Sequence, residues 1–209
     1  MLFIGITGGV GAGKTAILDY LREHYRARIL VADRIAEELM QPGTVCYEKL
    51  TELFAAEDIF IEKDPSNGFD RNRLAAVIFA DEVKRDALNA IVHPAVDVYV
   101  KEQLQAERER GTLNLLVIEA ALLIEKHYDE ICDELWYIFT SEENRKKRLT
   151  AGRGYSEEKT EQIFAAKLTE AEFRAVCKEE IDNNGTKEES FAQIDVLLSA
   201  RGINPVNPS

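Results

Sequence analysis

The sequence predicts an α/β fold of three layers, in which helices cover both faces of a five-stranded parallel sheet. Two observations lead to this prediction. Short apolar runs typical of buried strands alternate with amphipathic helical patterns along the 209 residues, and such alternation is typical of a parallel sheet. A glycine-rich loop, residues 8–15, lies between the first apolar run and a helix-like segment. That position is where ligands bind in open α/β sheets.

The five expected strands are residues 2–7, 28–31, 113–119, 135–139 and, more weakly, 179–182. Helical patterns lie between them, for example the apolar positions Val96, Tyr99, Val100 and Leu104, whose spacing places them on one helix face. Residues 1–31, 112–141 and 179–203 are therefore expected to form the core of the fold.

Two segments are too long to be simple crossovers between parallel strands. Residues 32–111 read as helix throughout, apart from the turn-rich KDPSNGFD at residues 63–70, and we predict a helical insertion there. Residues 142–178, rich in Arg, Lys and Glu, predict a second helical excursion. The tail, residues 204–209, holds two prolines without apolar periodicity, and we expect it to be frayed.

The composition limits the classes of partner and compartment. A formal net charge of -12 argues against a broad basic surface for nucleic acid. No apolar segment approaches the ~20 residues that span a bilayer, and the first apolar run is interpreted as a buried strand, not a signal peptide. The three cysteines are far apart and lack metal-ligand spacing, so buried free thiols are expected. A cytoplasmic monomer or weak homo-oligomer fits these features.

The glycine-rich loop, GGVGAGKT, predicts a site for a phosphate chain. Its pattern, Gly-x-x-x-x-Gly-Lys-Thr between a strand and a helix, turns backbone N–H groups toward phosphate oxygens and adds the positive end of the helix. Lys14 would reach the β- and γ-phosphates, and the Thr15 hydroxyl would bind Mg²⁺. ATP is thus expected to contact Gly8, Gly11, Ala12, Gly13, Lys14, Thr15 and Ala16.

GTPases, motor ATPases and small-molecule kinases all share this loop. The Asn-Lys-x-Asp tetrapeptide that selects guanine is absent from the sequence, and the Asp-x-x-Gly at residues 182–185 comes too late in the chain for a switch loop. A mechanical ATPase needs a larger domain. A small-molecule kinase needs an acceptor-binding insertion and a basic lid, and the two irregular helical segments fit those roles.

An ordered set of motifs resembles the dephospho-coenzyme A kinase family, from Phe3 to about Leu198. The motifs are ITGGVGAGKT, ADRIAEEL, PGT, FDRNRLAAVIF with His93-Pro94 after it, EAALLIE, RKKRLTAGRG and EEIDNNG. The resemblance implies a P-loop kinase core with a dephospho-CoA-binding insertion at 32–111 and a lid at 142–178. It also implies Mg²⁺-dependent transfer of the γ-phosphoryl of ATP to the ribose 3′-hydroxyl of dephospho-CoA, the final step of CoA synthesis.

Two carboxylates follow predicted strands at the edge where the loop lies. Asp33 comes just after the second strand, where it could accept the proton of the attacking hydroxyl; the alternative is the N-cap of the next helix, with Glu37 assisting. Glu119 ends the third strand and could hold Mg²⁺ through water or contact the acceptor. An ordinary strand-end carboxylate is the alternative for Glu119.

The remaining candidates come from the lid, the insertion and the end of the chain. Arg148 and Arg153 would close over the phosphates and stabilise transition-state charge, although either could be a solvated surface residue. His93 is either part of the acceptor pocket or a histidine at a helix start. Asn183 would lie near the adenine, as the resemblance implies.

The sequence also departs from the family pattern at four positions: Val31 where an Asp is frequent, Ala121 for a Pro, Lys167 for a Gln, and Lys178 for an acidic residue. Two alternatives to the family's activity therefore stay open. One is a kinase of another nucleoside or small alcohol, and the other is a nucleotide-binding protein without turnover.

Overall fold

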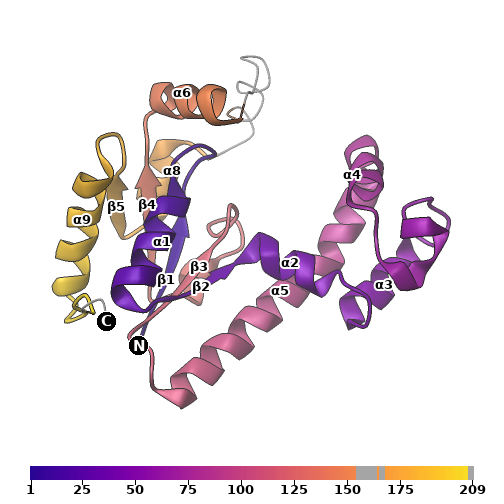
Figure 1. Cartoon of the computed structure of the whole chain (residues 1–209), viewed down its shortest axis with the longest axis horizontal. Helices are drawn as coiled ribbons and strands as arrows, with labels where there is room; N and C mark the ends of the chain where they lie inside the picture. The colour runs from indigo at the N-terminus through magenta and orange to yellow at the C-terminus, as the bar shows by residue number, and fades with distance from the viewer. Residues whose placement is uncertain (154–163, 165–167, 207–209) are drawn as a thin grey trace. The chain divides into compact units, whose positions relative to one another are not determined.

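The computed structural model describes residues 1–153, 164 and 168–206, apart from the side chain of Arg153. It confirms the α/β fold with one five-stranded parallel sheet, in the order β2-β3-β1-β4-β5 (Figure 1). The strands begin and end within two residues of the predicted positions: β1 (Leu2–Thr7), β2 (Arg28–Val31), β3 (Leu115–Glu119), β4 (Glu134–Phe139) and β5 (Glu179–Asp182).

The central strand is β1, which pairs with β3 on one side and β4 on the other. Ile4 is opposite Val117 in β3 and Glu134 in β4. Phe3, Ile4 and Ile6 are fully buried, because a strand between two parallel neighbours has both faces covered by helices or loops. The apolar run at the start of the chain is therefore the middle of the sheet.

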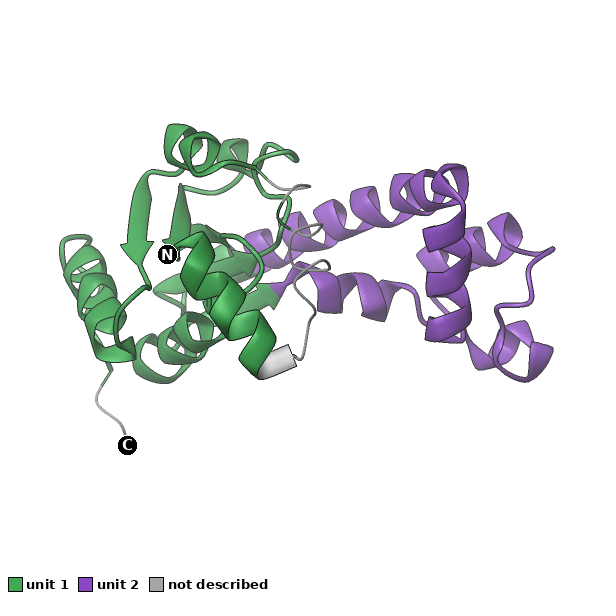
Figure 2. Ribbon diagram, turned by 90° about the horizontal axis from the view of Figure 1, so that it is seen from above, with its two compact units in different colours: residues 1–30, 107–209 green, residues 31–106 purple. Residues whose placement is uncertain are grey.

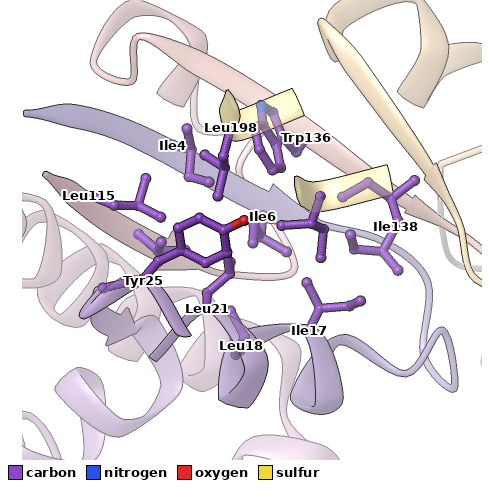
Figure 3. Packing of buried hydrophobic residues seen from close by; sticks show 14 of the residues in the cluster. Ile4, Ile6, Ile17, Leu18, Leu21, Tyr25, Leu115, Trp136, Ile138 and Leu198 are labelled. Atoms are coloured by element: carbon purple, nitrogen blue, oxygen red, sulfur yellow. The ribbon is translucent and has the colours of Figure 1, made fainter. Parts of the chain in front are cut away.

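One face of the sheet is covered by helices α1 (Lys14–Tyr25) and α9 (Lys187–Ser199). Figure 3 shows how Ile17, Leu21 and Leu198 from these helices pack against the strands around Trp136 and Ile6. Each such side chain, once fully buried, contributes about 1.5–3 kcal/mol. The start of α9 is fixed by Thr186, whose side chain and that of Glu189 form a reciprocal capping box.

The opposite face is covered in part by helix α8 (Glu170–Val176) and by the chain after β3. The Phe173 ring of α8 stacks on Tyr137 of β4, with centroids 4.5 Å apart. Leu123 and Tyr128 are buried in the segment that contains the short helix η3 (Tyr128–Glu130). The last part of the predicted lid, residues 170–176, thus packs on the sheet as one of its covering helices.

The chain divides into two compact units (Figure 2). The first, residues 1–30 and 107–209, contains the sheet, and the second, residues 31–106, is helical. The second unit, residues 31–106, overlaps most of the predicted insertion, residues 32–111. Their C-terminal ends differ because one helix, residues 82–110, continues from the second unit into the first. The helices of the second unit are α2 (Ala32–Leu39), α3 (Val45–Leu53), the short η1 (Ile61–Lys63) and η2 (Pro65–Asn67), α4 (Arg71–Ala80) and α5 (Glu82–Arg110).

Helix α5 contains Pro94 in its interior. The interpretation of His93-Pro94 as a helix start is therefore wrong. The predicted apolar face is present, because Val96, Val100 and Leu104 are buried while Tyr99 is half-buried. Packing along this face explains how the helix continues past a residue that removes one backbone hydrogen bond.

Helix α6 (Glu142–Arg153) begins the segment predicted as a lid. Residues 154–163 and 165–167, including Lys167, lie outside the described part.

At the end of the chain the Val206 N–H donates to the carbonyl of His24 at 2.7 Å, so the prediction of a frayed tail is wrong as far as Val206. Among the helices described, none is long and apolar enough to cross a membrane. Cys46 and Cys132 are buried free thiols as predicted, whereas Cys177 is only half-buried.

Candidate active site

The glycine-rich loop joins the C-terminal end of β1 to the N-terminus of α1. Gly11 and Gly13 have φ angles of 83° and 84°, in the left-handed region that glycine adopts without strain. At Gly8 a methyl group would lie 2.6 Å from the Ile138 carbonyl oxygen, so no larger residue fits there. The backbone geometry of the loop therefore requires glycine at these three positions.

Lys14 is the first residue of α1 and lies at the mouth of this loop. Its Nζ donates to the Gly8 carbonyl at 2.8 Å and is 3.5 Å from Glu119 Oε1 at the end of β3. The two side chains are each only 17% exposed. The predicted placement of Lys14 and Glu119 at one edge of the sheet is thus observed, and the pair forms a charged contact beside the phosphate loop.

Thr15 is exposed in the first turn of α1, and the Ala16 N–H donates to the Gly13 carbonyl at 3.2 Å. Mg²⁺ in nucleotide sites needs only one or two protein oxygens, since phosphates and water supply the other ligands. The described residues contain no group of three or more acidic, His or Cys side chains that could hold a metal alone. The Thr15 hydroxyl and the Glu119 carboxylate are oxygen ligands of the kind that a nucleotide-bound Mg²⁺ takes.

A cluster of three donors holds the backbone of the loop at Ala12. The Ala12 carbonyl accepts hydrogen bonds from Asn183 Nδ2 at 2.6 Å, Thr140 Oγ1 at 3.1 Å and Arg148 Nη1 at 3.3 Å. Ala12, Thr140 and Asn183 are buried. We call Ala12, Thr140, Arg148 and Asn183 the Ala12 junction. It connects the phosphate loop to the segment before α6 and to the loop that follows β5.

The Ala12 junction gives Arg148 and Asn183 roles that differ from those expected. The second terminal nitrogen of Arg148 donates to the Asn183 carbonyl at 2.7 Å, so both ends of its guanidinium are used inside the protein. Asn183 also accepts from Ser190 Oγ at 2.8 Å, so both the oxygen and the nitrogen of its amide make contacts inside the protein. Arg148 and Asn183 thus hold the backbone of the phosphate loop through hydrogen bonds, whereas they were expected to contact the nucleotide.

Sequence reasoning missed Arg145, which lies directly against the phosphate loop. A methyl group at Gly9 would overlap one of the terminal nitrogens of Arg145. Arg145 Nε donates to the Thr140 carbonyl at 3.1 Å, and its guanidinium stands 4.3 Å from the centre of the Phe164 ring. The available signal was the i, i+3 spacing from Arg148, which places the two arginines on one face of α6.

Asp33 belongs to the helical unit, where it lies in the first turn of α2 and is exposed. The alternative that Asp33 caps this helix is wrong, because the N-cap residue is Val31 and no side chain caps the helix. Glu37, the expected assistant in capping, instead forms a bidentate pair with Arg71 at 3.1 and 3.2 Å. Asp33 is thus left exposed directly after a strand of the parallel sheet.

Two further candidates have limited support from the described residues. His93 is a half-buried residue of α5 and does not line either of the two grooves found in the helical unit. Arg153 is the last residue of α6, and its side chain lies outside the described part of the chain. The roles of His93 and Arg153 therefore stay predictions.

The chain resembles known proteins over almost its whole length. A family model described as dephospho-CoA kinase matches residues 2–189. A protein from Geobacter sulfurreducens named dephospho-CoA kinase is 35% identical over 96% of this chain and 99% of its own.

Solved structures give the same fold. A protein from Thermus thermophilus is 27% identical, with a TM-score of 0.76 over 95% of this chain and 97% of its own. A dephospho-CoA kinase from Campylobacter jejuni is 18% identical, with a TM-score of 0.68 over 95% of this chain and 98% of its own. The second similarity supports the fold alone.

Proposed function

The chain belongs to the dephospho-CoA kinase family, and we propose that it transfers the γ-phosphoryl group of ATP to the ribose 3′-hydroxyl of dephospho-CoA, giving CoA and ADP. The observation that carries this proposal is the built phosphate loop. Its glycines have the required backbone angles, and Lys14 lies at its mouth beside Glu119. Such a loop needs an anionic ligand to use its inward N–H groups.

Each residue of the loop has a separate task in the proposed reaction. The N–H groups of residues 13–15 hold the phosphate chain, and Lys14 Nζ exchanges its contact with the Gly8 carbonyl for phosphate oxygens. Thr15 and Glu119 are positioned to hold Mg²⁺, directly or through water. When bound, Mg²⁺ would neutralise charge on the β- and γ-phosphates. The chain itself contributes mainly position and charge, which is what phosphoryl transfer requires.

We assign Asp33 as the group that receives the proton of the acceptor hydroxyl. The hydroxyl oxygen forms a bond to the γ-phosphorus while the bond from that phosphorus to the β,γ-bridging oxygen breaks, and ADP leaves. The hydroxyl proton passes to the Asp33 carboxylate. The exposure of Asp33 and its position directly after β2 support this role.

We assign acceptor binding to the helical unit. It contains two open grooves, one of about 500 Å³ lined in part by Cys46, Val98 and Tyr99, and one of about 570 Å³ lined in part by Phe69 and Arg71. Volumes of this size are typical of small-molecule sites. We also propose a cytoplasmic location and a monomeric or weakly associating state, which size-exclusion chromatography with light scattering would measure.

The experiment that tests the function is an acceptor panel. The purified protein is incubated with ATP and Mg²⁺, and ADP release is measured with dephospho-CoA, adenosine, other nucleosides and small alcohols. Release that depends on dephospho-CoA supports the proposal. Release with another acceptor alone, or tight ATP binding without any acceptor-dependent release, would overturn it.

The assignment of Asp33 predicts a specific effect of Asp33→Asn. ATP affinity should stay near that of the wild type, because the loop is unchanged, while kcat falls by a factor on the order of 10² or more. The measurement combines steady-state kinetics with ATP titration calorimetry. An unchanged kcat would remove Asp33 from the mechanism. Glu38→Gln, an exposed change on the same helix, is the matched control and should leave kcat unaltered.

A further inference from the structure

We propose that Arg145 is the residue of α6 that contacts the phosphate chain of the nucleotide, while Arg148 is a positioning residue for the loop. This inference rests on the proposed function only in taking a nucleoside triphosphate as the ligand. It differs from the prediction, in which Arg148 was expected to close over the phosphates and Arg145 was not considered. Two arginines three positions apart in α6 thus act on the same loop in different ways.

The first argument is the position of Arg145. Its guanidinium lies against Gly9, and its Cβ lies close to Gly11, where an added methyl group would be 3.4 Å away. Both glycines belong to the phosphate loop. The hydrogen bond from Arg145 Nε to the Thr140 carbonyl, at 3.1 Å, fixes the orientation of the side chain. Among the described residues of α6, Arg145 is therefore the cation that lies against the first half of the loop.

The second argument is that Arg145 forms no close ion pair with the carboxylates of the described residues. Within those residues no acidic side chain lies within 4.0 Å of it. Its neighbours on α6 differ in this respect, since Lys146 pairs with Glu142 at 2.8 Å and Lys147 with Glu143 at 2.6 Å. A half-buried guanidinium that forms no close ion pair with a described residue, beside a loop of inward N–H groups, is suited to an anionic ligand.

The third argument is the comparison with Arg148. Arg148 Nη1 donates to Ala12 and Thr140, and Nη2 donates to Asn183. In Arg145 the hydrogen bond observed among the described residues comes from Nε. The Phe164 ring, 4.3 Å from the guanidinium carbon, holds the plane of the group through a cation–π contact. A planar guanidinium with its terminal donors still available matches the oxygens of a phosphate.

The test compares Arg145→Gln, Arg148→Gln and the control Lys147→Gln, which removes the same charge from an exposed position of the same helix. Calorimetry measures binding of ATP, inorganic tripolyphosphate and adenosine, and thermal unfolding is followed without ligand. For Arg145→Gln we expect the affinities for ATP and tripolyphosphate to fall on the order of 10- to 100-fold, with adenosine binding and Tm unchanged. Lys147→Gln should change none of these values.

Arg148→Gln should instead lower the Tm of the free protein, because it removes three donated hydrogen bonds from the Ala12 junction. Arg145→Lys keeps the charge but loses the planar fork, so it should restore part of the affinity for tripolyphosphate. The proposal is overturned if Arg145→Gln leaves tripolyphosphate binding within twofold of the wild type, or if adenosine binding falls as much as ATP binding. None of these readouts requires an acceptor, so they remain decisive even if dephospho-CoA is not the substrate.

Discussion

Among single residues, Glu134 is a buried carboxylate with several charged and polar partners. This buried carboxylate at the start of β4 accepts from Arg201 Nε at 2.9 and 3.0 Å, from Lys178 Nζ at 2.7 Å and from Trp136 Nε1 at 2.9 Å. Burial alone would raise the pKa of Glu134, but the donors outweigh it and lower the pKa to about 2. Lys178, a departure from the family pattern, therefore has a structural partner.

This contact set predicts a destabilising effect of Glu134→Gln. The substitution leaves Arg201 and Lys178 beside an uncharged amide, so the free energy of unfolding at pH 7 should fall by about 2–4 kcal/mol. Because the folded pKa lies below the ordinary value of 4.5, the stabilisation is complete above pH 4.5 and is lost as the pH falls toward 2.

Urea unfolding at several pH values measures this effect. The wild type and Glu134→Gln should differ at pH 7 and converge near pH 2. Glu143→Gln, which breaks an exposed pair with Lys147, serves as the control and should cost less than about 0.5 kcal/mol. A difference between wild type and Glu134→Gln that stays constant with pH would contradict the assignment.

Residue positions were predictable where a short motif defines them. Lys14 and Thr15 lie at the start of α1 as expected, because the glycines and these two polar residues belong to one short loop of the sequence. The Ala12 junction was not predictable, since its acceptor is a backbone carbonyl and its donors lie more than 120 residues along the chain. Every residue has a backbone carbonyl, so the residue type at position 12 does not indicate which side chains donate to it.

At the scale of elements, helix α2 has an unusual beginning. Its N-cap residue, Val31, has the extended backbone that a cap requires, with φ −110° and ψ 110°, but no side-chain acceptor. The carboxylate that the family pattern frequently has at this position would supply one. The departure at Val31 therefore removes a helix cap and leaves the candidate base, Asp33, in the first turn.

The missing cap can be restored by Val31→Thr, which keeps the shape of the side chain and adds a hydroxyl. We expect the free energy of unfolding to rise by about 0.5–1 kcal/mol, because the hydroxyl accepts from a first-turn N–H of α2. The same change at Val45, where Thr44 already caps α3, should alter it by less than about 0.5 kcal/mol. Chemical denaturation of both variants measures the difference, and a Val31→Thr protein no more stable than wild type would refute the capping argument.

Helix α5 shows why the start and end of a helix are harder to predict from sequence than its helical character. The sequence suggested a helix boundary at His93-Pro94, because proline usually begins or ends a helix. The structure continues the helix from Glu82 to Arg110. Apolar contacts along the buried face, which are tertiary interactions, outweigh the local preference of one residue.

At the scale of the whole molecule, the sheet was predictable because most of its strands are short apolar runs, whereas β5 has one apolar residue, Ile181, and was the weakest prediction. The strand order, β2-β3-β1-β4-β5, could not be predicted in the same way, since periodicity indicates burial and does not identify neighbours. The observed order predicts a ranking of local stability. The amides of β1, paired on both sides, should exchange more slowly than those of the edge strands β2 and β5.

Native-state hydrogen exchange followed by mass spectrometry or NMR measures this ranking. We expect amides of residues 3–6 to exchange only through global unfolding, and those of β2 and β5 to exchange through smaller openings as well. Equal protection in all five strands would contradict the prediction. Amides in the first turn of α1 lack helical acceptors and provide a fast-exchanging reference.

The pairing of β1 also has a consequence for synthesis on the ribosome. The strands that pair with β1 are β3, residues 115–119, and β4, residues 134–139. This apolar strand therefore has no strand to pair with until more than half of the chain has been synthesised. The helical unit, residues 31–106, has all of its own contacts available before either neighbour emerges. During translation the helical unit can therefore assemble before the sheet, and the first strand made pairs only after that unit has been synthesised.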